Sequence, residues 1–425
     1  MMVSLRLELT VKFAYIRIFR ELSMKRLWLF LLLSLIVLAG GCAKQVARCT
    51  EPADNPAHHY LRGMEALEIG KTELAQEKFD RALYCEENFS AAYGGKALIA
   101  ALKSKGISDA GHRGVEVANA EEYLEKARKF AETDNDRFEY QLAVLRVVPV
   151  LKGKDWLDRA DAAYRSAMSF DKIDERRLEY YQGREAVSYF MGLAYLEGYQ
   201  FRKAEDKFRE TLDSRKMGKW NEPADKAWKK TSKIVRAMGG ITVGDVGRKI
   251  AVKDSVSRGD LAALLVDEMK IEKLFAGRIP VKSQLDAMKA EFTPADLLFH
   301  PFRDEVNTVM KWKVRGLEPK FDQTTKAYLF KPEDKVLRGE MAFILEDVLI
   351  KLTGNEKLAT AYFGQERSPF PDVKATSPYY NAVMNMTSRG IMEGELSGEF
   401  RFNEPLDGAE AILAIRMLQQ KINIY

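Results

Sequence analysis

Histidine and cysteine are scarce in this chain, which has four histidines and three cysteines among 425 residues. The histidines do not show the spacing of a metal site, such as two histidines one helical turn apart with a nearby acid. They are His58, His59, His112 and His300. The sequence also lacks a nucleophile elbow, a phosphate-binding loop and a dinucleotide-binding fingerprint. We therefore expect no metal, no cofactor and no enzymatic activity.

A large excess of one charge is missing as well. The chain has 67 basic and 62 acidic residues, and the segment 1–41 contains six of the basic and two of the acidic ones. The remaining residues, 42–425, therefore carry 61 basic and 60 acidic side chains. Proteins that bind nucleic acids usually show a basic excess, so this composition argues against a nucleic-acid partner.

Long hydrophobic runs are limited to one segment, residues 27–39. This run is shorter than the roughly 20 apolar residues that a membrane-spanning helix needs. Lys25 and Arg26 precede it and small residues follow it, which is the layout of an export signal. The alternative is a membrane anchor that is retained. We expect translation to start at Met24 and residues 1–41 to form a signal region.

The end of this region, Leu38-Ala39-Gly40-Gly41-Cys42, resembles the lipobox of bacterial lipoproteins. The resemblance implies cleavage before Cys42, a diacylglycerol on its sulfur and a further acyl chain, such as palmitate, on the new N-terminus. Because stable anchoring takes more than one acyl chain, these chains would hold the protein at a membrane. The resemblance further implies, from Ala43 in place of an aspartate, the periplasmic side of the outer membrane.

Two further cysteines, Cys49 and Cys85, follow the lipidation site. In an exported protein an even pair of cysteines can form a disulfide. Residues 42–55 are interpreted as a linker that can bend back toward a helix ending near Cys85. The alternative is two free cysteines, with Cys85 packed as a small apolar residue.

Residues 56–217 contain a repeated pattern of small and aromatic residues. The first copy consists of Gly63, Gly70, Ala75, Phe79 and Ala82, at offsets 0, 7, 12, 16 and 19. Its second half recurs at Ala120/Leu124/Ala127, Ala160/Tyr164/Ala167 and Ala204/Phe208/Thr211. These spacings resemble the tetratricopeptide repeat, although the intervals of 45, 40 and 44 residues are longer than that family's period.

This resemblance implies antiparallel helix pairs, with Gly70 ending the first helix and Phe79 filling the groove between two helices. It also implies a concave surface that docks a protein. The alternative is an ordinary helical bundle with alanine-rich seams. We interpret the Gly94-Gly95 and Gly239-Gly240 pairs as turns or helix breaks.

Residues 222–425 contain a second family of repeats with longer loops. The segments 303–317 and 377–391 share Asn, Val, Met, Arg and Gly at constant offset. Each segment continues through an aromatic loop and a proline into a second helix, and a third copy of that helix start occurs at 256–265. The layout resembles the S-layer homology domain, which usually occurs as three tandem copies.

Two landmarks carry this resemblance. Phe370-Pro-Asp-Val373 matches the family's opening motif, which the first copy lacks. The helix starts Ser257–Asp260, Leu337–Glu340 and Asp407–Glu410 are variants of its Thr-Arg-Ala-Glu motif, and the third has no arginine. From the residue types alone, we expect Ser257 and Asp407 to be helix N-caps.

Arg258 and Arg338 occupy the arginine position of this motif. The resemblance implies that they help to bind acidic cell-wall glycans, because a guanidinium group can donate two parallel hydrogen bonds to a carboxylate. The alternative is that each arginine pairs with an acid at a helix start or with a neighbouring repeat. We also expect Gly316 and Gly390 to adopt positive φ at helix ends.

The sequence thus predicts a mainly α protein with a tetratricopeptide-like array followed by S-layer-homology-like helix–loop–helix repeats. We expect a non-enzymatic, lipid-anchored tether or scaffold of the cell envelope. Its array would dock an unknown protein, and its repeats would bind peptidoglycan or an acidic wall-linked polysaccharide. The alternative is an assembly factor of an export or polysaccharide-secretion machine that uses both repeat regions to bind proteins.

Overall fold

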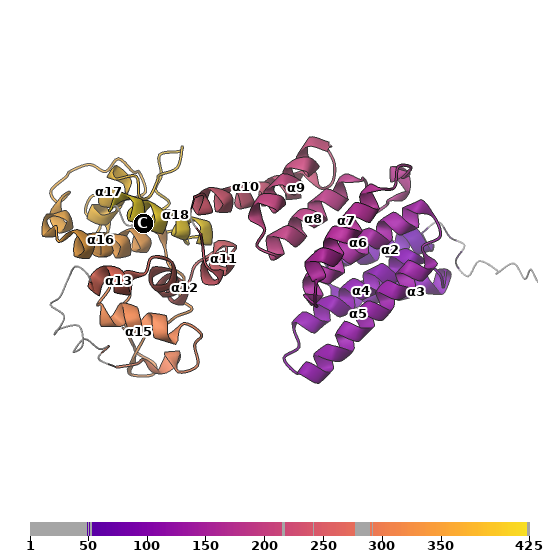
Figure 1. Ribbon diagram of the computed structural model, residues 1–425, viewed down its shortest axis with the longest axis horizontal. Helices are drawn as coiled ribbons and strands as arrows, with labels where there is room; N and C mark the ends of the chain where they lie inside the picture. Colours follow the sequence, from indigo (N-terminus) through magenta and orange to yellow (C-terminus); the bar gives the residue numbers. More distant parts are fainter. Residues whose placement is uncertain are drawn as a thin grey trace, which may run out of the picture.

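The computed structural model describes residues 49, 51 and 53–422, apart from 215–216, 241, 277–289 and 291. Within these residues the structure has sixteen α-helices and a single two-stranded sheet, so the predicted mainly α class is confirmed. The signal region and Cys42 lie outside the described residues. Within the described part of the chain, no helix has the length and apolar character needed to cross a membrane. Figure 1 shows two groups of helices joined through α10.

The first group is an array of helix pairs, in which α2 packs on α3, α4 on α5, α6 on α7 and α8 on α9. The bounds are α2 Pro56–Glu68, α3 Thr72–Cys85, α4 Ser90–Lys105, α5 Ala110–Phe130, α6 Asp134–Leu151, α7 Trp156–Met168, the short 3₁₀ helix η1 Glu175–Arg177, α8 Glu185–Glu197 and α9 Phe201–Ser214. The first helices of successive pairs also contact each other, so the pairs share one hydrophobic core.

Close packing of the first pairs depends on glycines that face the ring of Phe79. A Cβ atom at Gly63 or Gly95 would overlap this ring, which is fully buried between the helices, as predicted for Phe79. The prediction that Gly94-Gly95 forms a turn or helix break is wrong, because both residues lie inside α4. The pair instead allows close approach to neighbouring side chains. Gly70 separates α2 from α3 with φ +71°, as predicted.

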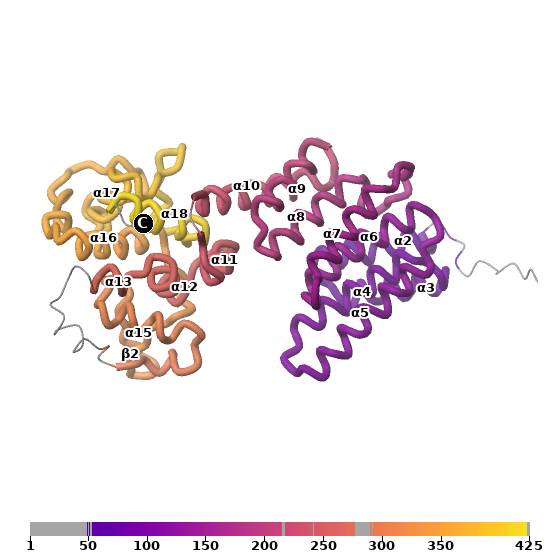
Figure 2. The backbone as a smooth tube through the Cα atoms, viewed as in Figure 1, coloured from indigo at the N-terminus to yellow at the C-terminus, as the bar shows by residue number. Residues whose placement is uncertain are grey.

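Helix α10 (Asn221–Met238) belongs to both groups of helices. Trp220, just before it, is buried in the core of the array, whereas Ile234 is buried in the core of the second group. Figures 1 and 2 show α10 running from α9 to α18, and it contacts both. Gly239-Gly240 ends this helix, as predicted. The predicted boundary between residues 217 and 222 thus falls at the start of a helix that both cores share.

The second group contains shorter helices and longer loops around its own core. Its elements are α11 Asp245–Ala251, α12 Arg258–Ala263, the π-helix η2 Leu264–Glu268, α13 Ile271–Ala276, η3 Ala295–Leu297, α15 Arg303–Lys311, β1 Lys320–Asp322, β2 Ala327–Leu329, α16 Arg338–Thr353, η4 Glu356–Thr360, α17 Tyr380–Ser388 and α18 Gly408–Lys421. The two strands form an antiparallel hairpin in which Phe321 lies opposite Tyr328.

The predicted local features of this group are confirmed. The side chains of Ser257 and Asp407 accept hydrogen bonds from the backbone N–H three residues later, at 3.2 and 2.9 Å, and so cap α12 and α18. Gly316 and Gly390 have φ of +90° and +64°. These features fix where the helices begin and end, and thereby position the side chains of the site.

Candidate functional site

Three helix starts, those of α12, α16 and α18, meet at the centre of the second group. The residues close before them, Val256, Val336 and Leu406, are buried. The backbone N–H of Val256 donates to the carbonyl of Leu406 at 2.8 Å, and that of Leu406 donates to Val336 at 2.9 Å. The N–H of Val336 donates back to Val256 at 2.9 Å. The three repeats therefore form a closed cyclic arrangement.

Arg258 extends from the start of α12 into the loop of the next repeat. Its Nε donates to the carbonyl of Phe330 at 2.9 Å. Nη1 and Nη2 donate to the carbonyls of Gly316 and Glu318, each at 2.8 Å. The side chain also lies over the ring of Phe330, and the residue is only 4% exposed. Each nitrogen of this guanidinium is thus occupied in joining two repeats.

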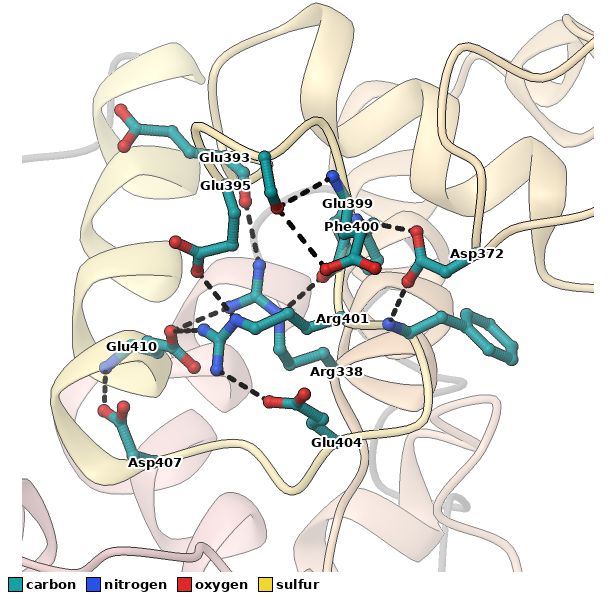
Figure 3. A network of polar contacts seen from close by, with 12 residues as sticks. Arg338, Asp372, Glu393, Glu395, Glu399, Phe400, Arg401, Glu404, Asp407 and Glu410 are labelled. Carbon is teal, nitrogen blue, oxygen red and sulfur yellow. Dashed lines mark hydrogen bonds and ion pairs between the residues drawn. The ribbon is translucent and has the colours of Figure 1, made fainter.

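Arg338 occupies the equivalent position at the start of α16. Its Nε donates to the carbonyl of Phe400 and its Nη2 to the carbonyl of Glu393, each at 2.8 Å. Its Nη1 lies 2.9 Å from Oε1 of Glu410, the acid at the start of α18 (Figure 3). In the structure, both arginines make the contacts that were considered as the alternative to glycan binding. Each contacts a neighbouring repeat, and Arg338 also contacts an acid at a helix start.

The third helix start has Gly408 where the other two have arginine, and the structure gives the reason. A Cβ atom at Gly408 would overlap the carbonyl oxygen of Ile250. In the first repeat only residues 252–257 separate α11 from α12, whereas 312–337 and 389–407 separate the equivalent helices of the other repeats. An arginine at position 408 would have no loop to enter. The short loop of the first repeat and the missing arginine of the third are therefore linked.

A partly buried aspartate holds the loop that Arg338 contacts. Asp372, from the predicted opening motif, accepts hydrogen bonds from the backbone N–H groups of Phe400 and Phe402, both at 2.8 Å (Figure 3). Burial opposes the charge of this carboxylate, but the N–H groups outweigh burial and hold the pKa of Asp372 below its ordinary value. The opening motif thus acts as an anchor for the loop.

Asp296 has the same function in the second repeat and was not identified from the sequence. It accepts from the backbone N–H groups of Phe330 and Lys331, at 3.2 and 2.7 Å. The available signal was Pro294-Ala-Asp-Leu297, which is similar to Phe370-Pro-Asp-Val373. A comparison at constant offset does not align the two motifs, because the segments that follow them differ in length.

Three cations contact one carboxylate oxygen of Glu410, and Figure 3 shows two of them, Arg338 and Arg401. Nη1 of Arg338 and Nζ of Lys233 each lie 2.9 Å from its Oε1, and Nη2 of Arg401 donates to the same atom. Burial raises the pKa of Glu410, but the nearby cations outweigh burial and lower it overall. Its Oε2 is buried and has no hydrogen-bond partner in the described part of the chain. Because Lys233 belongs to α10, this cluster joins the two groups of helices.

A groove of about 600 Å³ lies beside Glu410, between α10, α18 and residues 390–396. The charged residues that line it are Lys233, Arg236, Arg338 and Arg416 together with Glu393, Glu395 and Glu410. Glu395 and Glu410 are both paired with Arg401. Arg236 is exposed, and its side chain has no ion-pair partner among the described residues. The lining cations outnumber the lining acids by four to three, so the groove has a small positive excess.

The site residues that were predicted from the sequence lie in different parts of the structure. Arg338 lines the groove, whereas Arg258 is not among its lining residues. Cys49 and Cys85 are joined by a disulfide at the far end of the array, with their Cα atoms 5.3 Å apart. Lys233, Arg236 and Glu410 were not predicted as site residues, since they come together only through the packing of α10 on α18.

Comparison with known proteins identifies one family in this chain. Residues 369–412 match the family model of the S-layer homology domain. This segment contains the opening motif, α17, the loop held by Asp372 and the start of α18. An S-layer homology domain near the C-terminus of a mainly helical protein suggests binding of a cell-wall polymer and a place in the cell envelope. No curated protein and no solved structure matches the chain significantly.

Proposed function

We propose that this chain is a non-enzymatic tether or scaffold of the bacterial cell envelope. In this proposal, the second group of helices binds peptidoglycan or an acidic wall-linked polysaccharide. Acyl chains on Cys42 hold the other end in a membrane, on the periplasmic side of the outer membrane. The tetratricopeptide-like array between them docks a protein partner.

The observation that carries the wall-binding part is the cationic groove beside Glu410, in and next to the segment that matches the S-layer homology domain. An acidic polymer binds best to cations that are not neutralised by their own neighbours. Arg236 meets this condition, and its planar guanidinium suits a carboxylate on a sugar. Residues 390–396 add backbone groups that can hydrogen-bond sugar hydroxyls.

Arg338 and Arg258 have supporting roles in this proposal. The nitrogens of Arg338 are occupied at the floor of the groove, so this residue contributes charge and holds the loop that forms one wall. Arg258 holds the equivalent loop of the preceding repeat. For Arg258 to contact a glycan, its hydrogen bonds to the three backbone carbonyls would have to break. Direct ligand contact is therefore assigned to Arg236 rather than to the motif arginines.

Sedimentation of the mature chain with purified sacculi tests wall binding. Arg236→Gln removes an exposed cation, so we expect a loss of about 1 kcal/mol in binding free energy, or roughly fivefold in affinity. Arg176→Gln removes an exposed arginine of the array and serves as the matched control. Sacculi with and without their attached polysaccharide distinguish the two polymers. A parent chain that does not sediment would favour the assembly-factor alternative. Equal binding of sacculi by the two variants would exclude the groove as the wall-binding site.

Lipid anchoring is tested separately at Cys42. The Cys42→Ser variant should remain unprocessed or be released from membranes, since it has no sulfur to which a diacylglycerol can be attached. The measurement is membrane fractionation together with the mass of the N-terminal peptide. A variant that fractionates like the parent chain and has the same processed N-terminus would show that Cys42 is not the anchor.

A further inference from the structure

A second groove lies on the array, remote from the S-layer homology domain. It has a volume of about 680 Å³ and lies between α4, α6 and α8, with the start of α5 along one side. These three helices are the first members of successive pairs and contact one another in order. In Figure 1 they lie side by side through the array. The groove is therefore built from three separate helix pairs rather than from one.

The floor and walls of this groove are largely apolar. Leu145 and Phe190 are buried at its base, and Val150, Leu151 and Leu193 are partly exposed along it. A groove with this lining can take up apolar side chains and release water from both surfaces. It provides few hydrogen-bonding side chains of the kind that a chain of sugar hydroxyls requires.

Mostly basic residues surround the apolar lining. The cations are Lys105, Arg113, Arg146 and Lys152, and the only acid among the lining residues is Glu197. Glu197 pairs with Lys152, whose Nζ lies 2.8 Å from its Oε2. Lys105 and Arg113 are exposed and have no ion-pair partner among the described residues. Two cations at the edge thus remain available to an anionic ligand.

Arg146 adds a third positive charge at the base of the groove. Its guanidinium carbon lies 4.8 Å from the centre of the Phe190 ring and 5.4 Å from that of Tyr180. Its Nη1 is buried and has no hydrogen-bond partner within the described chain. Arg146 therefore adds positive charge beneath the groove, where an anionic group in the groove would be attracted to it.

We propose that this groove binds an acidic polypeptide segment that also carries apolar side chains. Carboxylates of the segment pair with the exposed Lys105 and Arg113, above the positive charge of Arg146, while its apolar side chains pack against the lining. Charge complementarity of this kind selects partners and speeds their association. The inference rests on the proposed docking role of the array and specifies the chemistry of its partner.

Selection from a randomised octapeptide library on the immobilised mature chain tests the inference. The selected peptides should combine Asp or Glu with Leu, Ile or Phe. The double variant Lys105→Gln/Arg113→Gln should bind a selected peptide about tenfold more weakly. Raising the salt concentration should also weaken binding, because the two cations are exposed. The matched control is Lys71→Gln/Arg177→Gln, which removes one exposed lysine and one exposed arginine elsewhere on the array and should bind like the parent.

The outcomes distinguish this groove from the proposed wall-binding site. Failure to select peptides, a neutral or basic consensus, or equal binding by the groove variant and its control would each overturn the inference. If the chain sediments with sacculi but selects no acidic peptides, only the docking inference fails. If it selects acidic apolar peptides but does not sediment with sacculi, the wall-binding proposal fails and the groove is supported.

Discussion

Lys233, on the helix that leaves the array, donates to the same oxygen of Glu410 that Arg338 contacts within the second group of helices. Both nitrogens lie 2.9 Å from this oxygen. Lys233 also lies 2.6 Å from Oδ2 of Asp407, the N-cap of α18. The orientation of the array relative to the S-layer homology domain is therefore fixed partly by ion pairs that also line the candidate groove.

Glu410→Gln tests the importance of this cluster for stability. The substitution leaves three cations around a neutral amide in a largely buried position. Because removal of one partner from a buried ion pair is strongly destabilising, we expect the free energy of unfolding to fall by about 3 kcal/mol. Chemical denaturation measures it. Glu395→Gln removes a half-exposed partner of Arg401 and should cost about 1 kcal/mol or less. Equal effects of the two substitutions would contradict the assigned role of Glu410.

Asp372 should make the stability of the protein depend on pH in the acid range. Its native pKa lies below the ordinary value of 3.8, so the carboxylate stabilises the folded state above that value. This contribution is lost as the pH falls through the native pKa. Asp372→Asn should therefore be less stable than the parent near neutral pH, and the difference should narrow below about pH 4. Thermal unfolding from pH 7 to pH 3 measures both curves, and a constant difference would contradict this assignment.

Gly408→Ala should destabilise the protein although alanine is the better helix former. The added Cβ atom would overlap the carbonyl oxygen of Ile250. We expect a loss of about 2–3 kcal/mol in the free energy of unfolding, a cost typical of overpacking. Gly114→Ala is the control, because a Cβ atom there meets open space within α5. It should be neutral or stabilising by up to about 1 kcal/mol. If Gly408→Ala behaves like this control, the explanation of the missing arginine is wrong.

Reduction of the Cys49–Cys85 disulfide should lower the stability of the protein and release the segment that leads to the proposed lipidation site. The bond closes a loop over a sequence separation of 36, and disulfides of this kind typically stabilise a protein by about 2–4 kcal/mol. Mass spectrometry of the non-reduced mature protein should detect the linked peptide. Unfolding with and without reductant gives the contribution of the disulfide to the free energy of unfolding. The Cys49→Ser variant should have the same free energy of unfolding as the reduced parent. Two alkylatable thiols in protein isolated from the envelope would rule out the bond.

Local chemistry accounts for the parts of this structure that the sequence predicted. Ser257 and Asp407 cap helices because of their own side chains, and Gly316 adopts positive φ because it has none. Gly95 was misinterpreted because its local preference is for a turn, whereas the packing of Phe79 requires a glycine inside a helix. The groove beside Glu410 was not predicted from the sequence. Lys233 and Glu410, which line it, are 177 positions apart and meet only after both groups of helices have folded.

The ring of hydrogen bonds through Val256, Val336 and Leu406 returns to its starting residue, so no fourth repeat can be added without opening it. The array has no such ring of backbone hydrogen bonds among the described residues, but its pairs are also tied together beyond immediate neighbours. Glu68, at the end of α2, accepts a hydrogen bond from Tyr180, which follows the third pair, and pairs with Lys219, which follows the fourth. A helix pair inserted between α3 and α8 would separate these residues, whereas a pair added before α2 would leave both these contacts and the ring intact.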